Sequence, residues 1–234
     1  MFSKKTVKVK NIFIGGEHEI VIQSMTNTDT LDISSTLNQI NNLYELGAQL
    51  IRVSVRSLDD IESFRIICAS SKVPLCADIH FDYRVAVESI KAGASKIRLN
   101  PGNIGAEWKV REVVNTAREY GVPIRIGVNS GSIKKEFSYL ERYKALAESC
   151  LEELRILESM EFGDVVLSLK SSDAMETYNA NLYVAGKVDY PMHLGVTEAG
   201  VWEDSIILSS AGIGSLLFNK IGDTIRVSIS GDPL

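Results

Sequence analysis

Residues 94–103 read ASKIRLNPGN, a short aliphatic strand that carries Arg98 and ends in a Pro-Gly turn. Four other segments repeat this design, each with a single cation inside an aliphatic or β-branched run. They are LIRVSV with Arg52, PIRIGVN with Arg125, VVLSLKSS with Lys170 and TIRVSIS with Arg226. Buried strands rarely carry a charge, so five charged strands in one chain need a common explanation.

The composition is that of an ordinary globular protein. The chain has 234 residues, of which 45% are apolar and 24% charged, enough for one α/β barrel. Its net charge of −5 argues against nucleic-acid and membrane-surface partners, which favour a basic face. No apolar run approaches the ~18 residues of a membrane span, and the first ten residues lack the apolar core of a signal peptide. We therefore expect a cytoplasmic protein.

The three cysteines, Cys68, Cys76 and Cys150, form no C-x-x-C pair. Their odd number favours reduced thiols over a disulfide framework, in agreement with a cytoplasmic location. We interpret them as packing residues, because free cysteine is most often buried as a small apolar side chain.

The remaining chain alternates short aliphatic strands with helical stretches of about ten to fifteen residues, several of which stop at a glycine. Residues 6–24 predict a strand, a tight turn at Gly15-Gly16 and a second strand that runs into the main fold. Further strands are predicted at 50–55, 74–81, 96–100, 123–129, 165–170, 192–197 and 224–230. Helices are predicted at 34–46, 59–70, 82–92, 106–120, from a capping box at Ser138 and Glu141 to about 160, 173–186 and 203–219.

Eight strands alternating with helices in ~230 residues indicate a (β/α)8 TIM barrel, with an N-terminal β-hairpin covering one end. A doubly wound sheet is the structural alternative, but no G-x-G-x-x-G follows the first strand. We expect residues 1–234 to form a single domain. The eighth helix of the barrel is missing after residue 230, so we expect the chain to be the front part of a longer protein.

Alternation along each strand separates an aliphatic face from a polar face. The aliphatic face must meet the outer helices, so the polar face points into the barrel. The inward positions are Arg52, Ser54, Asp78, His80, Arg98, Asn100, Arg125, Gly127, Asn129, Ser168, Lys170, His193, Gly195, Thr197, Arg226 and Ser228.

Five cations then face only Asp78 and Glu198 as nearby acids. At ~7 Å and an effective dielectric of ~20, each pair of like charges costs roughly 2 kcal/mol. Pairing with acids of neighbouring strands, or snorkelling to the barrel mouth, would explain any single cation but not all five. We therefore predict a phosphate or diphosphate ligand at the carboxyl ends of the strands. The turns at Asn100–Asn103 and Asn129–Ser132 expose backbone N–H groups there, although such turns are common.

Metal binding is less well supported. Asp78 and His80 resemble a pair of metal ligands, but no further ligands follow at a recognisable spacing. His193, beside the cations, is equally well explained as a hydrogen-bonding residue. We expect no metal site in this chain.

Seven segments together resemble the 4-hydroxy-3-methylbut-2-enyl diphosphate synthase family, and they cover essentially the whole chain in order. They are QSMTN (23–27), ADIHF (77–81), IRLNPGN (97–103), PIRIGVNSGS (123–132), SLKSSD (168–173), HLGVTEAG (193–200) and GDTIRVSISGDP (222–233). The resemblance implies a TIM barrel that binds 2-C-methyl-D-erythritol 2,4-cyclodiphosphate for isoprenoid precursor biosynthesis. It also implies an oxidoreductase that is a homodimer and receives electrons from ferredoxin or flavodoxin through a [4Fe-4S] cluster. The cluster lies in a C-terminal domain whose ligands are absent from this chain, so we expect the fragment alone to be inactive.

The resemblance also implies roles for individual residues. The diphosphate would be held by Arg52, Arg98, Arg125 and Lys170, with Asn129, Arg226 and Ser228 assisting. The carbon end of the substrate would be lined by Asp78, His80, Thr197 and Glu198, with Glu198 as a candidate proton donor or acceptor. Arg56 and the pair Val201-Trp202 depart from the small residues expected at their positions, so no role is assigned to Arg56.

Two other functions remain open on the residues alone. One is a pterin-binding barrel of the dihydropteroate synthase type, whose separate pterin motif is not evident. The other is a non-catalytic barrel that binds a sugar phosphate.

Overall fold

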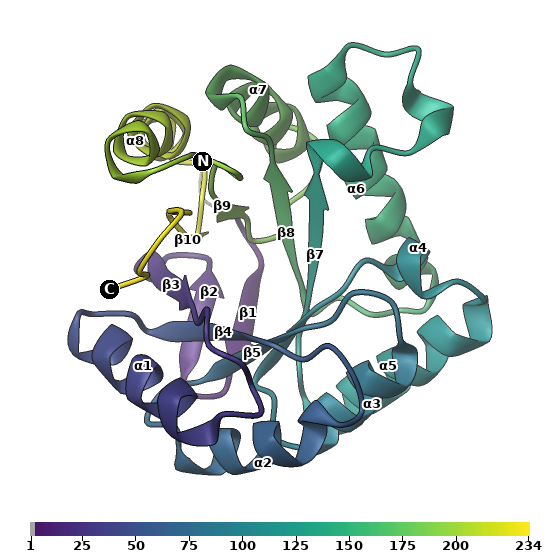
Figure 1. Ribbon diagram of the computed structural model, residues 1–234. Coiled ribbons are helices and arrows are strands. Elements are labelled where there is room, and N and C mark those ends of the chain that lie inside the picture. Colours follow the sequence, from purple (N-terminus) through teal and green to yellow (C-terminus); the bar gives the residue numbers. More distant parts are fainter. Residues whose placement is uncertain (1–2) are drawn as a thin grey trace.

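The computed structural model describes residues 3–234 and forms a barrel of parallel strands surrounded by helices (Figure 1). Among these described residues, eight strands pair in the order β8-β7-β6-β5-β4-β3-β10-β9, and a parallel bridge joins Leu167 of β8 to Met192, the residue just before β9. The strands are β3 (Val21–Met25), β4 (Leu50–Ser54), β5 (Leu75–Asp78), β6 (Lys96–Arg98), β7 (Ile124–Asn129), β8 (Val165–Lys170), β9 (His193–Leu194) and β10 (Thr224–Ile225). This arrangement confirms the predicted TIM barrel.

Within residues 3–234, seven long helices and one short helix follow the strands. They are α1 (Ile33–Glu45), α2 (Asp60–Ser70), α3 (Tyr83–Lys91), α4 (Pro101–Ile104), α5 (Glu107–Tyr120), α6 (Arg142–Ser159), α7 (Ala174–Ala185) and α8 (Trp202–Phe218). Aspartates 32, 82 and 173 begin α1, α3 and α7 by accepting hydrogen bonds from backbone N–H groups of the first turn. Residues 226–234, after β10, form no helix. The side chains of Ile22 on β3 and Val227 after β10 are 48% and 45% exposed.

The aliphatic face of the strands packs against the helices, as the alternation predicted. Ile51, Ile97, Ile124 and Leu167 belong to the large buried core and are fully shielded from solvent. Because a residue and its second neighbour lie on the same face of a strand, this packing directs the polar residues of the same strands into the barrel.

A β-hairpin of β1 (Thr6–Val9) and β2 (Ile12–Gly15) closes the end of the barrel where the strands begin. Val7, Val9 and Ile14 form a separate apolar cluster, packing with residues on the barrel strands. Those strand residues are Val21, Leu50, Cys76 and Val166. The apolar cluster therefore seals one end of the barrel and leaves the other end as the place for a polar site.

Several local predictions were wrong. The hairpin turns at Lys10-Asn11, where Lys10 adopts a φ of 53°, and Gly15-Gly16 instead connects the hairpin to β3. The capping box at Ser138 and Glu141 does not form, because Glu141 pairs with Lys144 at 2.7 Å and residues up to Ser138 enter 3₁₀ turns. These turns are η1 (Ser130–Ser132) and η2 (Lys135–Phe137).

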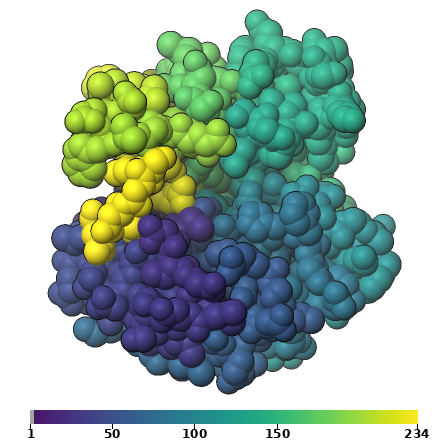
Figure 2. All heavy atoms as spheres, in the orientation of Figure 1, coloured from purple at the N-terminus to yellow at the C-terminus, as the bar shows by residue number. Residues whose placement is uncertain are grey.

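Two predicted strands, 192–197 and 224–230, are much shorter in the structure. Each keeps only two residues in regular pairing, and the chain continues beyond it as an extended loop. The last residues, yellow in Figure 2, lie between α8 and the N-terminal third of the chain. There the Ser230 N–H donates to the Gly200 carbonyl at 2.9 Å, and the Asn27 side chain donates to the Gly231 carbonyl at 3.2 Å.

The hairpin packing leads to a stability prediction. We expect Ile14→Ala to lower the free energy of unfolding by about 2–5 kcal/mol, because it opens a cavity in a closed apolar cluster. Phe13 lies on the opposite face of β2, and its side chain is 42% exposed. Phe13→Ala is therefore the matched control and should lower the free energy of unfolding much less. Urea denaturation of both variants measures the difference, and equal losses would show that the hairpin does not seal the barrel.

Candidate anion-binding site

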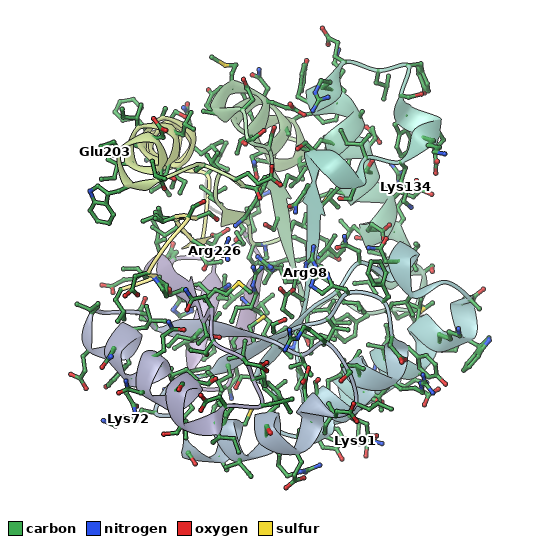
Figure 3. All side chains as sticks on the ribbon, viewed as in Figure 1. Lys72, Lys91, Arg98, Lys134, Glu203 and Arg226 are labelled. Atoms are coloured by element: carbon green, nitrogen blue, oxygen red, sulfur yellow. The ribbon has the colours of Figure 1, made fainter. Side chains whose placement is uncertain are left out.

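The inward polar residues line a cavity at the carboxyl ends of the strands. It holds about 460 Å³ of space not occupied by protein atoms, counting its open mouth. Its lining residues are Arg52, Asp78, His80, Arg98, Arg125, Gly127, Asn129, Ser168, Lys170, Thr197 and Arg226. Figure 3 shows Arg98 and Arg226 pointing into the barrel from opposite sides. All five predicted cations thus converge on one cavity.

Among the described residues, Asp78 is the only acid that lines the cavity. Its carboxylate oxygens lie 3.5 Å from Arg52 Nε and 3.5 Å from Arg98 Nη1, and its side chain is 5% exposed. Burial would raise the pKa of Asp78, but the charges of Arg52, Arg98 and Arg125 outweigh burial and lower it. One ionised carboxylate therefore serves several cations, and positive charge remains in excess.

The cations are held under electrostatic strain. Burial, followed by repulsion from Arg52, lowers the pKa of Arg125 to about 9 and that of Arg226 to about 9. Burial and the charge of Arg226 lower the pKa of Lys170 well below its usual value. Each shift has the sign expected of a cation that lacks sufficient negative charge nearby.

Several guanidinium donors in the cavity have no acceptor within residues 3–234. They are Arg98 Nε, Arg125 Nε, Arg125 Nη1 and Arg226 Nε. Buried donors without a partner are uncommon because each costs desolvation free energy that nothing offsets. Arg125 is only 1% exposed, so water compensates little of this cost.

Met25 on β3 is a weak partner of two other arginine groups. Its Sδ atom lies 2.7 Å from Arg52 Nη2 and 3.1 Å from Arg226 Nη1. A thioether is a poor hydrogen-bond acceptor compared with a phosphate oxygen. These guanidinium groups are therefore oriented but not satisfied.

Two glycines make room for the long cations. A Cβ atom on Gly127 would lie 2.8 Å from Arg98 Nε, and a Cβ atom on Gly195 would lie 2.5 Å from Lys170 Nζ. The Gly127 carbonyl also accepts from Arg98 Nη2 at 3.0 Å and from Asn100 Nδ2 at 2.9 Å. The absence of a side chain at these inward positions fixes where the two cations lie.

Comparison with known proteins agrees with this geometry. A family model for the GcpE TIM-barrel domain matches residues 4–234. The chain belongs to the GcpE TIM-barrel domain family.

Two relatives of this GcpE-family chain carry the name 4-hydroxy-3-methylbut-2-en-1-yl diphosphate synthase (flavodoxin). The relative from Thermotoga maritima is 52% identical over 231 residues, which make up 99% of this chain and 66% of the relative. The relative from Caldanaerobacter subterraneus subsp. tengcongensis is 50% identical over 235 residues, covering 98% of this chain and 66% of the relative. The chain therefore spans just under two thirds of their length.

Solved structures resemble the barrel at low sequence identity. Dihydropteroate synthase from Stenotrophomonas maltophilia has a TM-score of 0.68 and 15% identity, over 94% of this chain and 91% of that one. 3-Dehydroquinate dehydratase from Geobacillus kaustophilus has a TM-score of 0.68 and 14% identity, over 99% and 91%. At these identities the likeness shows the fold alone.

Not every site residue predicted from the sequence lines the cavity of the GcpE-family barrel. Glu198 is exposed, adopts a φ of 52° and lies outside the cavity lining. Ser228 also lies outside the lining, but its Oγ accepts a short hydrogen bond from Arg226 Nη2. His80 lies at the cavity with its side chain 49% exposed, and its Nδ1 is 3.4 Å from Arg98 Nη1.

Beside the cavity lining lie four buried polar residues that were not among the predicted site residues, namely Gln23, Lys96, His193 and Thr224. Lys96 Nζ donates to Gln23 Oε1 at 3.0 Å, and both side chains are buried. Lys170 Nζ lies 3.3 Å from His193 Nε2, and His193 Nδ1 lies 3.3 Å from Thr224 Oγ1. Strand alternation could have found Lys96, because it precedes Arg98 by two residues and shares its inward face.

Neither a metal cluster nor a membrane span is present in the described part of the chain. Residues 3–234 contain no group of three or more His, Cys, Asp or Glu side chains placed to hold a metal ion. Cys68, Cys76 and Cys150 are unpaired, and the latter two are buried. An iron-sulfur cluster therefore does not fit the residues that the structure describes. No helix among residues 3–234 is long and apolar enough to cross a membrane.

The position of Asp78 leads to a pH-dependent prediction. We expect Asp78→Asn to lower the free energy of unfolding at pH 7 by about 3–5 kcal/mol, because it leaves buried arginines unpaired. The stabilising contribution of Asp78 is present above the ordinary carboxyl pKa of 3.8 and is lost as the pH falls through the lowered pKa of the folded protein.

Denaturant unfolding of wild type and Asp78→Asn between pH 7 and pH 3 measures this contribution. Asp189→Asn, which removes a surface carboxylate paired with Lys4, is the matched control and should change stability little. A wild-type advantage over Asp78→Asn that stayed constant down to pH 3 would show that the carboxylate charge is not what matters.

Proposed function

We propose that this chain is the substrate-binding barrel of a 4-hydroxy-3-methylbut-2-enyl diphosphate synthase and binds 2-C-methyl-D-erythritol 2,4-cyclodiphosphate. The observation that carries the proposal is the cluster of five cations around a single carboxylate in one cavity. The names of relatives about 50% identical to the chain support the same substrate class.

A cyclic diphosphate suits the charge of the cavity. When all five cations are protonated, a dianion cancels about half of their excess over Asp78, which relieves the mutual repulsion of the arginines. Phosphate oxygens are strong acceptors for the unpaired Nε and Nη donors of Arg98, Arg125 and Arg226. Two phosphate groups also match a site that has arginines on opposite sides of the barrel.

In this proposal Arg52, Arg98, Arg125 and Lys170 bind the diphosphate. The assisting residues are Asn129, Arg226 and Ser228. Asp78 keeps Arg52 and Arg98 oriented through its ion pairs, and with His80 and Thr197 it lies beside the carbon end of the substrate. Glu198, exposed near the end of β9, would transfer a proton only after turning toward the ligand.

The redox part of the reaction lies outside the residues described here. The proposed reaction adds two electrons to the cyclodiphosphate, opens the ring at carbon and releases one hydroxyl as water after it takes up a proton. A [4Fe-4S] cluster held elsewhere in the full enzyme would supply the electrons, which come from flavodoxin or ferredoxin. The names of the relatives support flavodoxin as the donor. A homodimer is part of the same proposal.

The proposal also places the protein in the cytoplasm. The unpaired state of Cys68, Cys76 and Cys150 is the support for this location, because reducing compartments keep thiols free.

A pterin-binding barrel of the dihydropteroate synthase type is the second candidate, since such barrels have the same fold. The two functions require different polar groups in the cavity. A pterin ring presents neutral hydrogen-bonding edges, whereas this cavity offers unpaired guanidinium groups and one carboxylate. A non-catalytic barrel for a sugar phosphate would bind its ligand through the same cations, but it would not distinguish the cyclic diphosphate from a monophosphate.

The proposed function predicts tight binding of the cyclodiphosphate in isothermal titration calorimetry, weakened by added salt. Arg125→Met should reduce the affinity roughly 10- to 100-fold, because each lost charge-assisted hydrogen bond is worth about 1.5–3 kcal/mol. The same variant should be at least as stable as wild type, because it removes a buried cation with unpaired donors.

Arg111→Met, on the exposed face of α5, is the control and should leave binding unchanged. Erythritol 4-phosphate and a dihydropterin test the two alternatives in the same assay. Binding of the pterin as tight as that of the cyclodiphosphate, or no binding by folded protein, would overturn the proposal.

A further inference from the structure

Lys96 is a buried lysine that has no counterion among residues 3–234. It lies on β6, and its side chain is fully shielded from solvent. Its Nζ donates to Gln23 Oε1 at 3.0 Å, and no carboxylate in residues 3–234 forms an ion pair with it. The Nε2 atom of Gln23 has no hydrogen-bond partner in the described part of the chain. A fully charged lysine is costly in such a place.

Lys96 lies between two different layers of the barrel interior. Below it, the hairpin residues Val7, Val9 and Ile14 and the barrel residues packed on them provide no negative charge. Cys76 of β5 is its neighbour in the strand register and is equally buried. The charged and titratable groups that face Lys96 from the other strands are Arg52 of β4, Arg125 of β7 and His193 of β9.

We propose that Lys96 is a sixth cation of the anion site, one that becomes protonated when the diphosphate binds above it. This inference rests on the proposed function, since it requires an anion in the cavity. Lys96 does not touch the ligand in this account. It acts through Arg52 and Arg125, which lie between it and the ligand. Protonated Lys96 adds positive charge when the anion is bound, and neutral Lys96 adds no repulsion when the cavity holds no anion.

The lowered pKa of the Lys96 ammonium group supports this role. Burial is the largest influence, and together with repulsion from Arg125 and Arg52 it lowers the pKa of Lys96 to about 7. A nearby anion favours the charged form and raises the pKa again. Binding at pH 8 therefore draws a proton from solvent to Lys96 Nζ, while Gln23 Oε1 accepts a hydrogen bond from either protonation state.

The cyclodiphosphate is a suitable probe because it brings no titration of its own near pH 8. Each phosphorus is substituted on two sides and carries a single, strongly acidic oxygen, so it lacks the second ionisation of a phosphate monoester near pH 6. Any proton taken up on binding at pH 8 must therefore be bound by a group of the protein and not by the ligand.

The test measures proton uptake by calorimetry of cyclodiphosphate binding at pH 8, in buffers with different ionisation enthalpies. A pKa of about 7 leaves Lys96 mostly neutral in the free protein, so Lys96→Met should reduce uptake by more than about half a proton. Lys170 and His193 also have lowered pKa values, and the charge of Lys96 contributes to lowering that of His193, so the ¹³Cε resonance of Lys96 is followed alongside the uptake to assign the proton to Lys96. Lys91→Met, on the surface and paired with Glu88, is the control and should leave uptake unchanged.

Two further readouts keep the outcome clear. The affinity of wild type should fall more steeply between pH 7 and pH 9 than that of Lys96→Met, because binding and protonation are linked. If Lys96→Met does not fold, the ¹³Cε resonance of Lys96 in wild type should titrate at higher pH with ligand than without. Equal uptake by both proteins, or a Lys96 resonance that does not respond to ligand, would overturn the inference. Absence of binding by wild type would instead overturn the proposed function.

Discussion

Repulsion between the cations inside the barrel has to be balanced by every other part of the fold. In the part of the chain that the structure describes, five cations line one cavity, and Asp78 is the only acid among its lining residues. In a partly buried site, charges that close together are tolerated only because the fold holds them by other means. The pairing of aliphatic strand faces with the outer helices fixes the backbone, and the backbone then directs Arg98, Arg125 and Lys170 inward. The free energy gained by burying the apolar core offsets the repulsion between the cations in the cavity. Such local destabilisation is common at binding sites.

The barrel interior changes character along its axis, which explains why the cavity lies at one end. The hairpin residues pack with Val21, Leu50, Cys76 and Val166 into an apolar seal at the end where the strands begin. Lys96 and Gln23 lie above this seal, and the arginines lie above them. Gly127 and Gly195 give the long side chains space near the mouth. A ligand therefore meets charge at the opening and an apolar cluster at the opposite end of the barrel.

The fold and the inward cations could be predicted from the sequence because the face on which a residue lies depends on its position along the strand. An error in the predicted length of the strand does not change that face. Residues 224–230 were predicted as a strand of seven residues and only Thr224–Ile225 pair regularly, yet Arg226 still points inward. Positions set by loops were harder to predict. The exposure of Glu198 follows from a left-handed backbone in a loop, and the hairpin turn at Lys10 lacks the glycine that marked Gly15-Gly16 as the turn. Lys96 was not predicted because it is the first residue of β6, and lysine is almost never fully buried.

A crystal structure with bound 2-C-methyl-D-erythritol 2,4-cyclodiphosphate would show whether the cations of the barrel hold the diphosphate. We expect both phosphate groups inside the barrel cavity, with oxygens within hydrogen-bond distance of Arg125 and of at least two of Arg52, Arg98 and Arg226. We also expect the arginine groups now beside Met25 Sδ to turn to the phosphates. A ligand bound outside the barrel, or bound inside with these guanidinium donors still unpaired, would contradict this expectation.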